Sequence, residues 1–418
     1  MVTGLRRDLG LSGAVVTGLG SILGTGVFVS IAVAAGFAGR WVLVAAPVAG
    51  VVATFNGLSS AQLAAAHPVA GGTYEYGYRF LGPWTGFAAG WLFLVAKTAS
   101  AATAAVGLAG YAAALVGLGT DARRWLAVGA VAAITALVVA GIKRTAAANA
   151  LLVGFTVSAL VVFLIVGLSE SPPAGIRLGQ PAPVSTLPAA IAFLFVAYTG
   201  YGRIATLGEE VRDPQRTIPR AVITTLAVSA LLYTSVAAVG WYASGGVWEV
   251  LDDGAPLANL LGDPWARLVE IGAVLAMLGV LLNLVLGLSR VWLAMGRRGD
   301  MPRTLAVVDH RGSPTAAVIV TGAFVLFGAL VDDVRMTWSF SAFAVLLYYA
   351  VTNLAALRLP PEARRFPRWM AWAGLASCLF LSFFVPLGVW LTGVAVIAVG
   401  LLWRFAYSRR DTQTLSPT

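Results

Sequence analysis

Long apolar stretches follow one another along almost the whole of this 418-residue chain. A helix of about 20 apolar residues is long enough to cross the roughly 30 Å hydrocarbon core of a bilayer. Hydrophobic residues make up 59% of the sequence and charged residues 11%, with a mean hydropathy of +0.85. One soluble core could not bury this much apolar surface, so we predict an all-α integral membrane protein that crosses the bilayer many times.

Twelve spans follow from this length rule, and they leave no room for a soluble domain. They cover residues 12–35, 41–66, 84–115, 124–142, 146–168, 186–209, 218–243, 266–296, 314–331, 336–357, 369–386 and 388–406. The longest loops, near 169–185, 244–265 and 297–313, are short. We therefore expect residues 1–418 to form a single transmembrane domain.

The formal net charge of +10 fits either a nucleic-acid partner or a membrane protein with basic cytoplasmic loops. If the N-terminus faces the cytoplasm, most Lys and Arg residues fall on cytoplasmic loops, and acidic residues such as Asp252 and Asp332 fall outside. This distribution follows the positive-inside rule. We predict a multi-pass protein of the cytoplasmic (inner) membrane with both termini in the cytoplasm and no nucleic-acid partner. The start, MVTGLRRDLGLSG, lacks a small-residue cleavage site and is predicted to be retained.

Residue types that carry catalysis or bind metals are sparse. The chain has one cysteine, Cys378, and two histidines, His67 and His310. A single cysteine excludes an intrachain disulfide, and the sequence has no metal-ligand spacing, phosphate-binding loop or catalytic triad. We expect a protein that is not an enzyme and that uses no metal and no cofactor.

Two of the predicted spans are interrupted by glycine near their middle. The first carries GLGSILGTGVFVS from Gly18 to Ser30, and the sixth carries AFLFVAYTGYGRIATLGEE from Ala192 to Glu210. Glycine weakens a helix interior by about 1 kcal/mol relative to alanine. Interrupted segments at matching positions in two halves of a chain are typical of inverted-repeat transporters, whose binding site lies at the bilayer midplane. The alternative is that these glycines only allow close helix packing, which we favour for Gly18 and Gly20 alone.

An interrupted helix exposes backbone groups that are tolerated only where they line a cavity or meet protein. The new helix N-terminus at Gly24, Thr25 and Gly26 would offer N–H donors that suit a carboxylate. The carbonyl groups near Ile22 and at residues 196–199 would suit an ammonium group. The two interruptions together therefore predict a site for an α-amino acid.

Four stretches resemble motifs of the amino acid–polyamine–organocation (APC) superfamily. The residues from Gly20 to Phe28 are similar to its first-span G-S-x-x-G-T-G-x-F motif, and Pro68–Tyr74 is similar to its P-x-A-G-G-x-Y loop. The segment Thr206–Ala221 resembles the one that closes its sixth helix, and Ser289–Pro302 resembles the end of its eighth. The matches keep their order and spacing, so the chain resembles an amino acid permease of this superfamily.

The resemblance implies a LeuT-type fold of 12 transmembrane helices with helices 1 and 6 broken. Residues 12–168 and 186–357 would form two inverted five-helix repeats, followed by helices 11 and 12 at 369–406. It also implies secondary transport of amino acids or related amines by alternating access. The substrate-binding residues carried over by motif, with their nearby candidates, are Ser21, Ile22, Gly24, Thr25, Gly26, Val196, Ala197, Tyr198, Thr199 and Gly200.

The sequence departs from relatives at positions tied to ion coupling. Gly202 and Arg203 stand where many relatives place an acidic residue, and Ala146–Gly167 lacks the fifth-span lysine of some proton-coupled relatives. Ile271–Leu288 lacks the hydroxyl residues of sodium-coupled members. Coupling is therefore not inherited from the resemblance, and protons are favoured over sodium.

Lys97 lies inside the third span, GWLFLVAKTASAATAAVGLAG. A lysine at mid-helix costs about 2.5–3.5 kcal/mol on insertion scales. One interpretation is that its side chain reaches back to the cytoplasmic interface. The other is that Lys97 faces the substrate pocket, where desolvation would let the amine gain and lose a proton. Lys97 is then our candidate for proton coupling, and it would repel cationic substrates.

Charged residues gather at the cytoplasmic end of the sixth span. They form either a solvated, ion-paired loop or an inner gate that opens with the half-helix, through pairs with Arg79 or with Arg290 and Arg297. The gate candidates are Arg203, Glu209, Glu210 and Asp213.

The leading hypothesis is a secondary transporter that carries neutral amino acids, with proton-coupled uptake. Exchange and export remain open, because the sequence does not give the direction. A transport-inactive sensor on the same fold is an alternative of another class, against which the intact Gly24–Gly26 interruption argues. A membrane-embedded enzyme lacks a cluster of catalytic residues within the spans.

Overall fold

The computed structural model describes residues 9–69, 71–141, 146–169, 182–208, 210–248, 254–309 and 313–413. Within these ranges the secondary structure is helical, apart from one isolated bridge between Leu9 and Val211. The α-helices are α1 (Leu11–Ile22), α2 (Ile31–Ala38), α3 (Val42–Ala66), α4 (Thr73–Phe80), α5 (Pro83–Val116), α6 (Thr120–Val139), α7 (Ala146–Ser169), α8 (Leu187–Tyr198), α9 (Gly202–Ala205), α10 (Pro214–Ala243), α11 (Trp265–Arg298), α12 (Thr315–Ala329), α13 (Val334–Leu357), α14 (Arg368–Ser382) and α15 (Leu387–Gln413).

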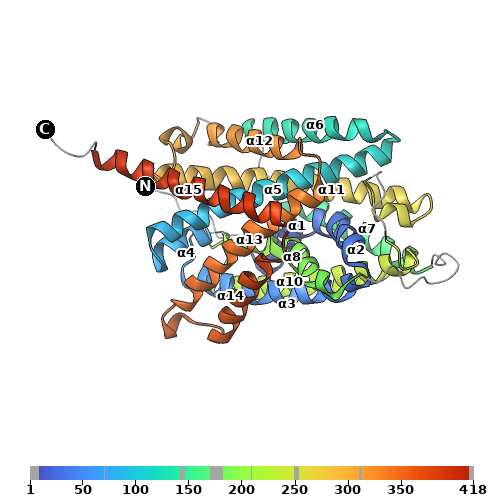
Figure 1. Ribbon diagram of the computed structural model, residues 1–418, viewed down its shortest axis with the longest axis horizontal. Coiled ribbons are helices and arrows are strands. Elements are labelled where there is room, and N and C mark those ends of the chain that lie inside the picture. The colour runs from blue at the N-terminus through green and yellow to red at the C-terminus, as the bar shows by residue number, and fades with distance from the viewer. Residues whose placement is uncertain are drawn as a thin grey trace.

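Long helices form one bundle, with α4 at one end and α2 toward the other (Figure 1). Among the described residues, nine helical runs are long and apolar enough to cross a membrane, and α1 and α12 are shorter apolar helices. The prediction of an all-α, multi-pass membrane protein is therefore confirmed at this level. The number of twelve spans and their division into two repeats stay predictions.

The first span is interrupted where the glycines lie. Helix α1 ends at Ile22, Leu23 takes an extended conformation (φ −75°, ψ 102°), and a π-helical turn at Gly26–Ser30 continues into α2. A Cβ atom on Gly24 would lie 2.6 Å from the Val280 side chain, so the absence of a side chain lets this segment pack against α11.

The sixth span changes its winding and does not unwind. Helix α8 passes into a 3₁₀ turn at Thr199–Tyr201 and then into α9, with helical dihedrals throughout. A Cβ atom on Gly200 would lie 2.2 Å from the carbonyl oxygen of Ser21. Only glycine fits here, so the two interrupted spans meet backbone against backbone.

The long helices α5, α10, α11 and α13 surround this meeting point. Helix α5 packs against both α11 and α13, and α10 packs against α1 and α3. These neighbours bring side chains from distant parts of the sequence to the interrupted helices.

Candidate functional site

A cavity of about 40 Å³, which we call the central cavity, lies where α1, α5, α8, α11 and α13 meet. Nine residues predicted as substrate-binding or coupling residues line it: Ser21, Ile22, Thr25, Gly26, Lys97, Val196, Ala197, Thr199 and Gly200. The sequence analysis missed four further lining residues, Ser100, Val280, Leu284 and Trp338. Apolar residues such as Val280 and Trp338 carry no sequence signal that separates a cavity wall from a core.

Two predicted site residues are not among those that line the central cavity. Gly24 packs against Val280 of α11. The Tyr198 side chain is fully buried and points toward α3, where its hydroxyl donates a 2.9 Å hydrogen bond to the Ala46 carbonyl. Both residues support the site from behind in this conformation.

Lys97 lies on α5, and its side chain reaches the joint between α8 and α9. The amine donates a 2.9 Å hydrogen bond to Thr199 Oγ1, which in turn donates to the Val196 carbonyl at 2.7 Å. Within the described part of the chain, no carboxylate is in salt-bridge contact with Lys97. The amine therefore lies in the wall of the central cavity beside a polar backbone, with no acidic partner among the residues that the structure describes.

The carbonyl groups at the interruptions differ from the expectation of bare acceptors. The Tyr233 hydroxyl on α10 lies 2.8 Å from the Ile22 carbonyl oxygen and 3.2 Å from that of Ala197. The Tyr349 hydroxyl on α13 donates to the Thr199 carbonyl at 3.2 Å. An unpaired carbonyl is costly inside a membrane, and tyrosines from neighbouring helices supply the missing donors.

The hydroxyl group of Thr25 is buried and, among the described residues, has no hydrogen-bond partner. The side chain of this residue is 2% exposed. Buried hydroxyls without a partner are uncommon. The Thr25 hydroxyl, beside Gly26 in the lining of the central cavity, is therefore a candidate for contact with a polar substrate atom.

Among the described residues, no salt bridge joins the predicted gate residues to one another. Arg203 lies on α9 and is partly buried. The backbone carbonyl of Glu210 accepts a 3.1 Å hydrogen bond from Leu9 N, at the start of the first span. Asp213 pairs with Arg216 at 3.8 Å on an exposed surface, where such pairs contribute little. Glu209 lies outside the described residues.

A polar cluster that the sequence analysis missed ties α4 to α15 and to the segment after α11. The Asp300 carboxylate accepts hydrogen bonds from the Tyr74 and Tyr78 hydroxyls at 2.7 and 2.6 Å and forms an ion pair with Arg404. Burial and the neighbouring carboxylate raise the pKa of both tyrosines, Tyr74 and Tyr78, which therefore stay protonated donors. These residues are far apart in the sequence, so no local pattern could have grouped them.

Comparison with known proteins agrees with this architecture. The family model described as amino acid permease matches residues 13–416. The chain is 42% identical to an uncharacterized transporter of Mycobacterium tuberculosis, with 98% of this chain and 94% of the relative covered. It is 28% identical to the branched-chain amino acid permease of Bacillus subtilis and 27% identical to a methylthioribose transporter of the same organism; 98% of this chain is covered in both, with 94% and 95% of the relatives.

These relatives are transporters and not enzymes, as predicted, and the resemblance drawn from the first-span motif is confirmed. The match extends over nearly the whole sequence and includes both interrupted helices. The chain belongs to the amino acid permease family.

Proposed function

We propose that this protein carries neutral amino acids across the cytoplasmic membrane by alternating access and that Lys97 couples the transport to protons. The observation that carries the proposal is the 2.9 Å hydrogen bond from Lys97 to Thr199 in the wall of the central cavity. Both termini face the cytoplasm in this proposal, which follows from the positive-inside distribution of charge.

The lining of the central cavity supports a neutral substrate. A protonated Lys97 would repel a cationic side chain, and the walls away from it are apolar at Val196, Val280, Leu284 and Trp338. A ligand with an uncharged, largely apolar side chain loses least on entering such a cavity. The relative named a branched-chain amino acid permease is in line with this choice.

The proton would travel with the substrate. A substrate carboxylate near the Lys97 amine stabilises its charged form. When the substrate leaves, the buried ammonium loses its carboxylate partner and keeps the hydrogen bond to Thr199, and it releases its proton to the same side. Substrate and proton would then cross together, and the amine would return in its neutral form.

The test is uptake by purified protein in liposomes. A panel of labelled neutral and cationic amino acids is offered with a pH gradient, a sodium gradient or neither. We expect pH-driven uptake of neutral amino acids, and we expect Lys97→Gln to abolish the pH response while exchange of internal for external substrate continues. Lys143→Gln, which replaces the other lysine of the chain, is the matched control and should keep the wild-type response.

Three results would redirect the proposal. An unchanged pH dependence in Lys97→Gln would remove Lys97 from coupling. Exchange or efflux without net uptake would favour an exchanger or exporter. Substrate binding without movement in any gradient would favour a transport-inactive sensor.

A further inference from the structure

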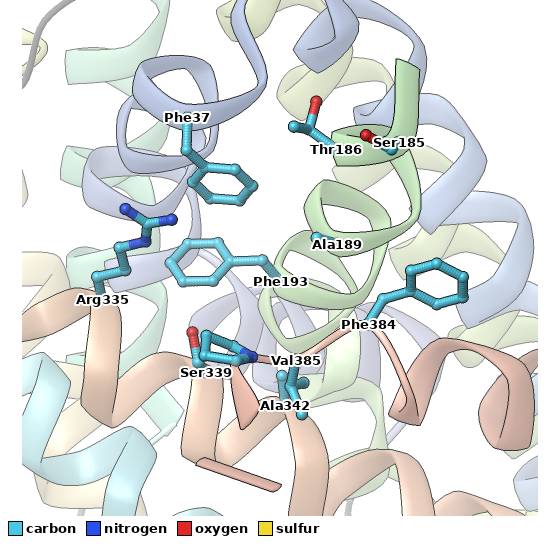
Figure 2. A pocket seen from close by; sticks show the side chains of 11 residues that line it. Phe37, Ser185, Thr186, Ala189, Phe193, Arg335, Ser339, Ala342, Phe384 and Val385 are labelled. Carbon is cyan, nitrogen blue, oxygen red and sulfur yellow. The ribbon is translucent and has the colours of Figure 1, made fainter. Parts of the chain in front are cut away.

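A second cavity, larger than the central cavity, is bordered by α8 and α13. No residue of α1 lines it, in contrast to the central cavity. It has a volume of about 320 Å³ and is partly open, and we call it the outer cavity. Its walls come from the end of α2, the 3₁₀ turn before α8, the first half of α8, the first three turns of α13 and the turn between α14 and α15 (Figure 2). Its position on α8, before the Val196–Gly200 segment, puts it on the opposite side of the central cavity from α9.

The two cavities differ in what they can hold. Pockets for small molecules usually measure about 300–1,000 Å³, whereas a buried water needs about 10–15 Å³. The central cavity, at about 40 Å³, has room for a few waters in this conformation, and the outer cavity has room for an amino acid. A substrate arriving from this side would meet the outer cavity first.

Aromatic side chains separate the outer cavity from the central one. Phe193 lies in the wall of the outer cavity and Trp338 in the wall of the central cavity, with their ring centroids 6.4 Å apart. The Trp338 indole also donates a 2.9 Å hydrogen bond to the Phe193 carbonyl. Passage between the two cavities along this contact requires these two residues to part.

The outer cavity combines one cation with hydroxyls and aromatic rings. The Arg335 guanidinium lies 4.8 Å from the centre of the Phe37 ring and forms no salt bridge with any carboxylate in the described ranges. Ser185 and Ser339 contribute hydroxyl groups, and Phe37, Phe193 and Phe384 border the same space (Figure 2). A guanidinium binds a carboxylate through two parallel hydrogen bonds, and the rings provide contact area for an apolar side chain.

We propose that the outer cavity is a second binding site for an amino acid with an apolar side chain, held by its carboxylate on Arg335 before Phe193 and Trp338 part. The proposal rests on the proposed transport function and adds a step to it. It makes Arg335 a recognition residue on the path to the central cavity.

Cysteine protection tests the site directly. The one native cysteine, Cys378, is buried, so a single introduced cysteine reports its own accessibility to a membrane-impermeant thiol reagent. Ser185→Cys lies in the outer cavity, and Ser169→Cys lies on an exposed helix end that does not line it. We expect L-leucine to slow modification of Ser185→Cys and to leave Ser169→Cys unaffected. L-leucinol, which lacks the carboxylate, should give no protection.

Arg335→Gln should raise the half-protecting leucine concentration at Ser185→Cys by tenfold or more, and Arg335→Lys should raise it less. Protection that is equal in wild type and Arg335→Gln would overturn the proposal, because it would then arise indirectly from the central cavity. Protection by leucinol, or by phosphatidylglycerol nanodiscs without leucine, would also overturn it, the latter in favour of a lipid headgroup site. The unchanged reactivity of Ser169→Cys in each Arg335 variant verifies that the variant is folded.

Leucine uptake by the same preparations separates the two proposals. Uptake by wild type without protection at Ser185→Cys would refute the outer site alone. Protection that depends on Arg335, without uptake in any gradient, would refute transport and leave the outer site as a binding site.

Discussion

The hydroxyl of Tyr233 lies against carbonyl groups of both interrupted helices, so its removal tests how these carbonyl groups are used. Tyr233→Phe keeps the ring and removes one oxygen that lies 2.8 Å from the Ile22 carbonyl and 3.2 Å from the Ala197 carbonyl. One hydroxyl donates one proton, so the loss is about one hydrogen bond. Leaving a buried acceptor unsatisfied costs about 1–3 kcal/mol, and hydrogen bonds measured inside a membrane protein average about 0.6 with a maximum near 1.7. We expect the empty protein to lose about 1–2 kcal/mol of stability.

Tyr233→Phe should weaken the stability of the empty protein but strengthen its binding of the substrate. If the Ile22 and Ala197 carbonyls accept the substrate ammonium, it competes with Tyr233 in the wild type and fills unpaired acceptors in Tyr233→Phe. A gain of about 1 kcal/mol corresponds to roughly a fivefold change in affinity. We expect KM for L-leucine uptake to fall severalfold and kcat to fall with it, because tighter binding slows release.

The assay is liposome uptake together with thermal unfolding with and without leucine. Tyr198→Phe is the matched control, because its ring lies 4.8 Å from that of Tyr233 and its hydroxyl also donates to a backbone carbonyl. That carbonyl belongs to Ala46, which does not line the central cavity, whereas Ile22 and Ala197 do. The control should lose similar stability with an unchanged KM. A raised KM in Tyr233→Phe with unchanged stability would refute the reasoning, since the hydroxyl would then contact the substrate itself.

Three further predictions concern other parts of the structure. Gly200→Ala would push a methyl group to 2.2 Å from the Ser21 carbonyl oxygen and should abolish uptake, while Gly287→Ala, with no atom within 4 Å, should leave uptake intact, as measured in liposomes. Asp300→Asn breaks a buried ion pair with Arg404 and should lower the free energy of unfolding by about 3–5 kcal/mol in thermal unfolding. Glu75→Gln, which breaks a partly exposed pair, is the comparison and should cost less. The double change Asp300→Asn/Arg404→Gln should cost less than the sum of the two single changes. Burial and the nearby Arg79 lower the pKa of His67 from its ordinary value of 6.5. Below about pH 6.5 the histidine of the unfolded state therefore takes up a proton before that of the folded state, and the protein should lose stability. His67→Gln should make the melting temperature depend less on pH in this range.

Sequence patterns predict those parts of this structure that depend on local composition. Hydropathy locates the spans, since each helix must satisfy the same bilayer length, and glycine marks the two interruptions because only glycine allows Gly200 to touch Ser21. A lone lysine in an apolar span is equally visible, and Lys97 does lie in the wall of the central cavity. Tyr233 and Trp338 were not visible, because an aromatic residue in a span usually only packs. Their partners lie on other helices, and no spacing within α10 or α13 encodes them.

The contacts of the two interrupted spans indicate how a motion at one would reach the other. Near the central cavity, Gly200 packs on Ser21, and the Tyr233 hydroxyl lies against carbonyls of both α1 and α8. At the far end, Leu9 donates to the Glu210 carbonyl and accepts from Arg212 N, which ties the start of α1 to the segment after α9. Helix α1 and α9 are thus joined at both ends by backbone contacts that a side-chain rearrangement alone does not release. We infer that the two half-helices on this side move together as one body, and the hydrogen bond from Lys97 to Thr199 connects α5 to the turn that precedes α9.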